Sequence, residues 1–156
     1  MNIDIVYLNF YFLYQWRRLF TSQMEETPAN CLQAAIGYHV GPSTFVIKTA
    51  SGAIIGGCVE AKWKVCYFLF QVEPSASIYT TKSGQFFVNH DENYVTEAGN
   101  MKGFGLYEDD DDATKWSTSH IFFSSSLDLC VASFLGDKPM KIEAFEVWGF
   151  GDELYD

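Results

Sequence analysis

Cysteine is scarce in this sequence and is not arranged as cysteine-dependent scaffolds require. The four cysteines of the 156 residues stand singly, at Cys31, Cys58, Cys66 and Cys130, without a CxxC pair. A secreted disulfide framework or a structural zinc site would need denser or paired cysteines. We therefore expect reduced thiols and a cytoplasmic protein, and the absence of Asn-x-Ser/Thr sequons agrees with this. A redox-active cysteine among the four stays open.

Histidine and the short motifs of catalysis and cofactor binding are equally sparse. The histidines are His39, His90 and His120, and none makes the HxxxH or HExxH spacing of a zinc-binding helix. Ser119 and His120 are adjacent, so on a strand they would point to opposite faces. The stretch GFGLYE, residues 103–108, fails the GxGxxG pattern, and no GK[ST] occurs. The sequence therefore predicts no catalytic residues, no metal and no cofactor.

Positive charge is also in short supply. Lys and Arg number 10 against 20 Asp and Glu, which gives a formal net charge of −10. An acidic chain is repelled by phosphate backbones and by anionic lipid. The balance therefore argues against binding to nucleic acid or to a membrane surface, and it favours a basic or metal-bearing partner.

The main apolar run is too short to cross a bilayer. IDIVYLNFYFLYQW, residues 3–16, has 14 residues, fewer than the roughly 20 that a membrane helix needs. It contains Asp4 and Asn9 and precedes Arg17 and Arg18. It also lacks the basic start and the small-residue cleavage site of a signal peptide. So apolar a segment must be covered, and a buried strand or core helix is the favoured interpretation, with a membrane anchor as the minor alternative.

The length suits one domain, and its patterns are mostly those of strands. TPANCLQAAIG, residues 27–37, predicts a helix with Thr27 as N-cap, Pro28 at its first position and a left-handed Gly37 after its end. Strands are predicted at 43–49, 53–59, 66–72, 84–88, 94–99, 103–107 and 142–148. The connection 50–52 predicts a hairpin between the first two. The predicted fold class is α+β, mainly β: a two-sheet antiparallel β-sandwich with a few flanking helices.

Two adjacent glycines stand where a strand ordinarily avoids them. Gly56 and Gly57 interrupt the predicted strand AIIGGCV. Glycine in a strand interior marks a β-bulge or a close approach of another chain segment. The bulge is the favoured interpretation.

The last predicted strand carries a carboxylate among apolar residues. In IEAFEVW, alternation places Phe145 and Val147 on one face, and Glu146 on the other together with Ile142, Ala144 and Trp148. A half-buried carboxylate needs a partner. Backbone amides or an arginine are the favoured partners, and a general acid of raised pKa is the alternative.

Four stretches resemble, in this order and spacing, the TLDc domain of eukaryotic proteins: PSTFVIKTASGAIIGG, FLFQVEPSASIY, GFGLYEDDDD and FEVWGF. The resemblance divides the chain into an aromatic N-terminal segment, 1–13, and a single TLDc-like domain, 14–156. The residues that match the family signature are Trp16, Lys48, Gly56, Trp63, Phe68, Phe70, Gly99, Gly103, Glu146 and Trp148. The chain departs from the family between Trp63 and Phe68, where a loop is shortened to KVCY, and at Trp116, where the family commonly has glycine.

The resemblance implies a two-sheet β-sandwich with flanking helices and a link to protection against oxidative stress. Some family members bind and regulate the vacuolar-type proton-pumping ATPase, and no catalytic residue set is established for the family. A non-catalytic protein-interaction domain is therefore implied, with subunits of that ATPase as candidate partners and recruitment to a membrane or organelle through such a protein. The alternatives are a structural subunit of another large assembly, cytoskeletal or ciliary, and a thiol-based antioxidant enzyme.

An acidic run of five residues raises the question of a binding site. It fails the calcium-loop pattern, because Ala113 and Ser119 stand where glycine and glutamate are required. Five like charges in a row repel one another unless a basic surface or a cation meets them. A solvated turn, a docking edge for a basic protein and a divalent cation site are the interpretations, in that order. The candidate partner-binding residues are Glu108, Asp109, Asp110, Asp111 and Asp112.

Overall fold

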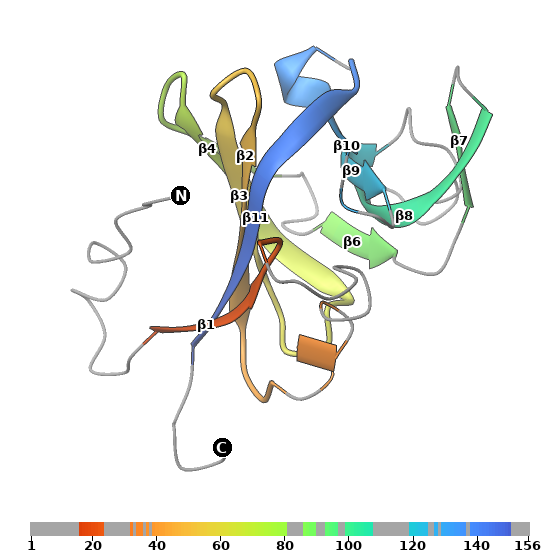
Figure 1. Cartoon of the computed structure of the whole chain (residues 1–156). Coiled ribbons are helices and arrows are strands. Elements are labelled where there is room, and N and C mark those ends of the chain that lie inside the picture. Colours follow the sequence, from red (N-terminus) through yellow and green to blue (C-terminus); the bar gives the residue numbers. More distant parts are fainter. Residues whose placement is uncertain are drawn as a thin grey trace.

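The computed structural model describes residues 16–23, 32, 34, 35, 37, 39–80, 86–89, 93–96, 99–107, 119–124, 127, 129–136 and 138–150. Figure 1 shows the elements that these residues form. The strands are β1 (Trp16–Thr21), β2 (Ser43–Thr49), β3 (Ile54–Val59), β4 (Val65–Glu73), β5 (Ser77–Tyr79), β6 (Phe86–Asn89), β7 (Asn93–Thr96), β8 (Gly99–Tyr107), β9 (Ser119–Ser124), β10 (Leu129–Ala132) and β11 (Met140–Phe150). A 3-10 helix, η3, spans Ser133–Leu135.

Eight of these strands close into an antiparallel barrel. Hydrogen bonds connect β2, β3, β4, β6, β8, β9, β10 and β11 in that order, and β11 pairs with β2 to complete the ring. Outside the ring, β1 pairs with β11, β5 with β4 and β7 with β8. The predicted two-sheet sandwich with flanking helices is therefore wrong. The fold is all-β, and its sheet is closed.

The ring closes because each of its three longest strands pairs with two different strands, one after the other, along the same edge. β11 pairs along one edge with β2, and along the other first with β10, at Met140 and Lys141, and then with β1. In the same way β4 has β6 and then β5 along one edge, and β8 has β7 and then β6. Such a strand carries one sheet into the next and removes the open edges that a sandwich would have.

The predicted strands occur, with small shifts at their ends. The strand 43–49 is reproduced as β2, and the hairpin to β3 is closed by a hydrogen bond from the Thr49 N–H to the Ala53 carbonyl, 2.9 Å. Gly52 takes a left-handed conformation in this turn, with φ of 93°. The strands β1, β5, β9 and β10 were not among the strands predicted from periodicity.

Helical structure is minor in the described part of the chain. The described residues of the predicted helix 27–37 are helical: Leu32, Ala34, Ala35 and Gly37. Gly37 is itself helical, so its predicted left-handed position after the helix is wrong. Within the described residues, no helix is both long and apolar enough to span a membrane.

Aromatic rings fill the barrel interior around Phe45. The centroid of its ring lies 6.3 Å from that of Phe145, 6.1 Å from that of Phe123 and 5.9 Å from that of Trp63. Trp63 lies in the turn between β3 and β4, where it is buried with a positive φ of 55°. Its indole N–H donates to the Ser43 hydroxyl at 2.9 Å, which satisfies the one polar atom of this buried side chain.

Candidate functional site

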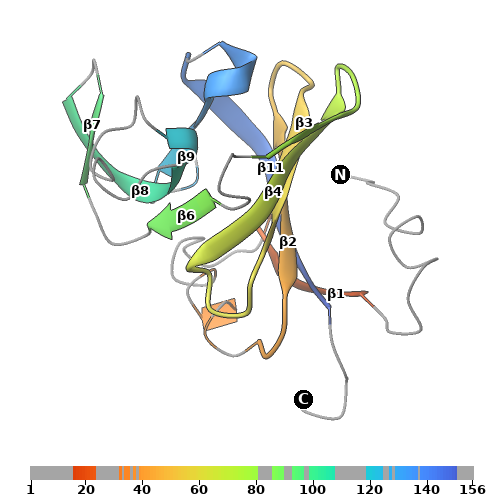
Figure 2. The same ribbon diagram turned by 180° about the vertical axis from the view of Figure 1, so that it is seen from behind.

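The residues that the family signature singles out gather mainly on one face of the barrel. β11, β2, β3 and β4 form a continuous wall, which β1 extends at one edge and β5 at the other (Figure 2). Side chains along each strand alternate between the barrel interior and the outer face of this wall. We define the outer face by the outward-facing residues of these strands: Thr44, Val46, Lys48, Ile54, Gly56, Cys58, Phe68, Phe70, Ala144, Glu146 and Trp148.

Strand pairing sets these outward residues in two rows. One row runs across β11, β2, β3 and β4 through Glu146, Val46, Gly56 and Phe70. The next row runs through Trp148, Thr44, Cys58 and Phe68. Six signature residues thus share the outer face, although they are up to 100 positions apart in the sequence (from 48 to 148).

The other signature residues lie elsewhere. Trp63 belongs to the barrel interior. Trp16, at the start of β1, packs on Phe150, with ring centroids 5.2 Å apart. Gly99 and Gly103 are the first and fifth residues of β8, and strand pairing places Gly103 opposite Ser124 of β9.

Glu146 is the buried charge of the outer face. It is 5% exposed and accepts a hydrogen bond from the indole N–H of Trp148, with Nε1 3.0 Å from Oε2. The Arg18 guanidinium of β1 lies 3.9 Å from Oε1. The predicted arginine partner is thus confirmed, whereas the indole donor, two residues along the same strand face, was missed. Both carboxylate oxygens have a partner, as a buried charge requires.

The face predicted for Ile142 is wrong because β11 contains an irregularity. Its pairing with β2 shifts register between Ile142 and Ala144. Ile142 consequently belongs to the core, together with Phe145 and Val147. One extra residue in β11 reverses the face on which the side chains before it lie. The apolar periodicity of the sequence does not reveal this irregularity.

Trp148→Phe is expected to lower the free energy of unfolding by about 1.5 to 3 kcal/mol, because it removes a hydrogen bond to a buried charged group. Arg18→Met should change it by less than about 1 kcal/mol, since the Arg18 side chain is 52% exposed and its ion pair is long. Urea unfolding of both variants measures the difference. Equal losses would contradict the indole as the main partner of Glu146.

The two adjacent glycines are explained by the close approach of neighbouring atoms and not by a β-bulge. The pairing of β3 with β2 is continuous through Gly56 and Gly57, so the favoured bulge is wrong. A Cβ atom on Gly56 would meet the Phe45 carbonyl oxygen and lie 2.6 Å from Phe70 Cζ. A Cβ atom on Gly57 would lie 2.8 Å from the Phe45 ring, inside the barrel. The alternative that the sequence left open, a close approach, is confirmed on both faces of β3.

The acidic run Glu108–Asp112 lies outside the described residues. Its place along the chain is still defined, because β8 ends at Tyr107, β9 begins at Ser119, and these two residues are paired. The connection 108–118 therefore leaves and re-enters the barrel at neighbouring positions. Its role as a docking edge stays a prediction.

The described thiols are poor candidates for redox chemistry. Burial raises the pKa of the Cys66 thiol, and the nearby Cys58 raises it further. Burial raises the pKa of Cys130 to about 12. It also raises the pKa of Cys58, although a hydrogen bond with Thr44, 3.3 Å long, acts in the opposite direction. Since the thiolate is the nucleophile, these three side chains should react slowly with peroxide.

The same thiols predict a loss of stability in alkali. A thiol whose pKa is higher in the folded than in the unfolded chain binds its proton more tightly when folded. For Cys130 this stabilisation is complete below the ordinary pKa of 9.0 and is lost as the pH rises toward about 12. The free energy of unfolding should therefore fall by up to about 1.4 kcal/mol per pH unit for this thiol. Urea unfolding between pH 8 and 11 should give Cys130→Ala a correspondingly shallower slope, whereas parallel profiles would refute the assignment.

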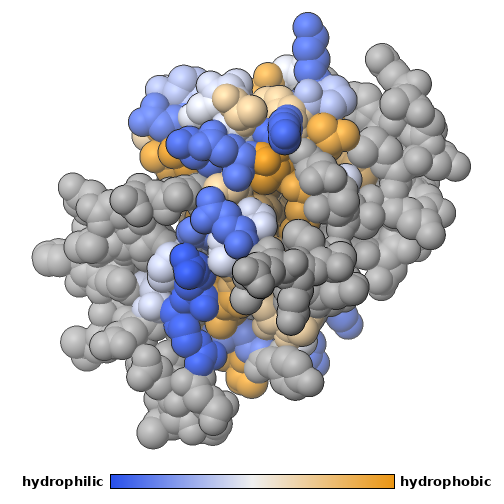
Figure 3. Space-filling view, in the orientation of Figure 1, coloured by the Kyte–Doolittle hydropathy of each residue, from blue (hydrophilic) through white to orange (hydrophobic). Residues whose placement is uncertain are grey.

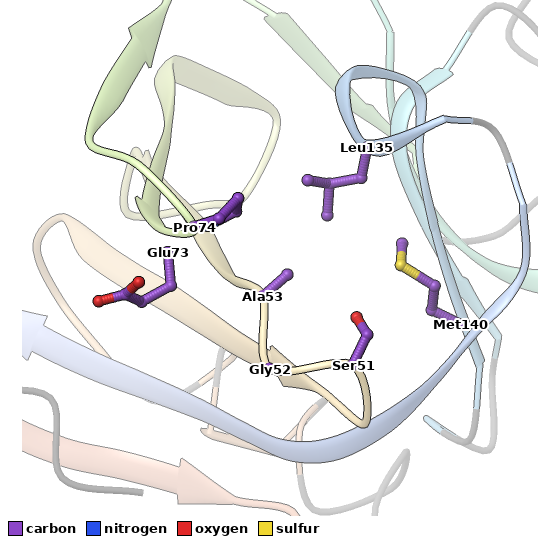
Figure 4. Close-up of a pocket in the computed structure, with 7 residues that line it drawn as sticks. All are labelled: Ser51, Gly52, Ala53, Glu73, Pro74, Leu135 and Met140. Carbon is purple, nitrogen blue, oxygen red and sulfur yellow. The ribbon is translucent and has the colours of Figure 1, made fainter.

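A hollow of about 300 Å³ lies where the β2–β3 turn, the end of β4, η3 and the start of β11 meet. Its lining is Ser51, Gly52, Ala53, Glu73, Pro74, Leu135 and Met140. In Figure 4, Ala53, Leu135 and Met140 extend toward the open space, whereas the Glu73 carboxylate points away from it. Glu73 is the one ionisable residue of the lining. A catalytic pocket would bring several polar groups together, and this lining does not.

Among the described residues, His39 is not part of a group of side chains that could bind a metal ion. The imidazole Nε2 of His39 lies 3.1 Å from the Pro42 carbonyl oxygen and donates to it. Among the described residues, no group of three or more His, Cys, Asp or Glu could hold a metal ion.

The chain matches the model of the TLDc domain over residues 4–151. Because this match covers nearly its whole length, the chain belongs to the TLDc domain family. No curated protein is similar enough to the chain to count as a match. The resemblance to this family that the sequence indicated is confirmed.

Proposed function

We propose that this chain is a non-catalytic protein-interaction domain that contributes to protection against oxidative stress by binding a partner in a large assembly. The observation that carries the proposal is its membership of the TLDc family over residues 4–151. The raised pKa values of Cys58, Cys66 and Cys130 also favour it over a thiol-based antioxidant. In this function the domain acts in the cytoplasm and reaches a membrane or organelle through its partner.

The docking edge in this proposal is Glu108–Asp112. A chain of net charge −10 attracts a basic surface, and five adjacent acids concentrate that attraction in one connection. On the face that Figure 3 shows, hydrophilic side chains are interspersed with hydrophobic ones over the described part of the surface. Subunits of the vacuolar-type proton-pumping ATPase are the candidate partners, because some family members bind this enzyme.

An affinity pull-down of the intact chain from its native cell extract tests the proposal. The chain is compared with a variant in which Asp109, Asp110 and Asp111 are replaced by Asn. A matched variant has Gln at Glu60, Glu73 and Glu143, which removes the same charge from the described surface. Each extract is run at about 50 mM and about 500 mM salt, on either side of effective screening.

Recovery of proton-pump subunits is expected at low salt from the chain and from the matched variant. The Asp variant should lose at least about 90% of that signal, and high salt should abolish it in every case. Equal recovery by both variants would refute the acidic docking edge. Recovery of a different, salt-resistant assembly would refute the ATPase as partner and indicate a structural subunit held by apolar burial.

A further inference from the structure

The centre of the outer face is buried, although it points away from the barrel interior. Thr44, Val46 and Glu146 are only 1%, 2% and 5% exposed. β2 as a whole is buried at six of its seven positions. This is the pattern of a strand that has a covering layer on each side. The barrel interior supplies one layer, so the outer face requires another.

None of the described elements forms that second layer. In Figures 1 and 2, β6, β8, β9 and β10 lie on the interior side of the wall, and β1 continues it at one edge. The side chains of the wall cover one another in part, since Phe70 lies against Gly56 and Trp148 bonds Glu146. Phe68, Phe70 and Trp148 themselves remain half-buried, and they present aromatic surface outward.

The segment 3–15, IDIVYLNFYFLYQ, has the composition and the reach that this layer needs. It is almost entirely apolar and aromatic, and it leads directly into β1 at Trp16, on the edge of the wall. Thirteen residues span about 43 Å when extended and about 20 Å as a helix. Cys58 on β3 lies three strands from β1, or about 14 Å across the sheet. The segment can therefore cross the outer face in either conformation.

We propose that residues 3–15 pack against the outer face and form the second layer of the wall. Their aromatic side chains meet Phe68, Phe70 and Trp148, which buries large apolar surfaces that would otherwise face water. The signature residues of the outer face then serve to hold this chain's own N-terminal segment. An external partner binds elsewhere, and the segment is not an anchor for another assembly. This inference does not rest on the proposed function.

Cys58 provides a native reporter, because it lies on the outer face while Cys66 and Cys130 are in the core. In a Cys31→Ser background, cysteine is placed singly at each position from 5 to 13, and the chain is oxidised with copper–phenanthroline. One or two of these positions should form a disulfide with Cys58, which requires Cα atoms within about 7 Å. Val40→Cys, at a site 74% exposed, is the control expected to form none. Absence of a disulfide from every N-terminal position would overturn the proposal.

Thiol alkylation in the same background gives an independent readout. Phe10→Asp should expose the outer face and accelerate alkylation of Cys58 about tenfold or more, with Cys66 and Cys130 unchanged. Ile78→Asp, at a site 71% exposed on β5, is the matched control and should leave all three rates unchanged. An unchanged Cys58 rate in Phe10→Asp would overturn the proposal. If all three thiols accelerate together, the variant has unfolded and the cross-linking result decides.

Discussion

Phe45→Ala is expected to lower the free energy of unfolding by about 3 to 5 kcal/mol. Phe45 is fully buried, and its ring centroid lies between 5.9 and 6.3 Å from those of three other core aromatic rings. Its removal leaves a cavity that a closed barrel cannot collapse, because each neighbouring strand is held on both edges by backbone hydrogen bonds.

Urea unfolding at neutral pH measures this loss. Tyr67→Ala is the matched control, since it removes an aromatic ring that is 50% exposed and should change the free energy of unfolding by about 1 kcal/mol or less. A loss for Phe45→Ala no larger than that of the control would contradict Phe45 as the centre of the core.

Gly56→Ala is expected to destabilise the protein by about 3 kcal/mol, an unusually large effect for one added methyl group. The new Cβ atom would meet the Phe45 carbonyl oxygen, which is fixed in the β2–β3 ladder, and would lie 2.6 Å from Phe70 Cζ. The backbone atom cannot turn away as a side chain does, so the two strands must separate locally.

Gly37→Ala is the matched substitution and should have the opposite sign. Gly37 is helical, and a Cβ atom there would have no neighbour within 4 Å. Alanine should therefore stabilise the chain by about 0.5 to 1 kcal/mol. Thermal or urea unfolding of both variants tests the pair, and changes of the same sign would show that close packing does not account for Gly56.

Local patterns predicted most of the long strands because their signal lies within a few residues. The strand 43–49 and its hairpin follow from alternation and a glycine turn, and β2 and β3 have this arrangement. The arginine partner of Glu146 was also foreseeable, since a carboxylate on a half-buried strand face needs a donor. A strand as short as β5, which has three residues, carries too little of such a signal.

The pairing of strands that lie far apart in the sequence could not be predicted from these local patterns. Nothing in the residues 140–150 distinguishes a strand with two partners on one edge from a strand with one, yet this feature closes the barrel. The register shift near Ile142 likewise reverses a face without a glycine or proline to mark it. The candidate site was therefore predicted residue by residue, while its assembly on one face depended on strand order.

The sequence by itself determined the family, the strand-rich composition, the acidic charge and the need for a partner at Glu146, because each depends on residue types at short spacing. Only the tertiary structure decided that the sheet closes, that Gly56 and Gly57 admit neighbouring atoms, and that distant signature residues share the outer face. These features depend on which strand lies beside which. The order of the strands is determined by the packing of the whole core, so it cannot be predicted from any single segment.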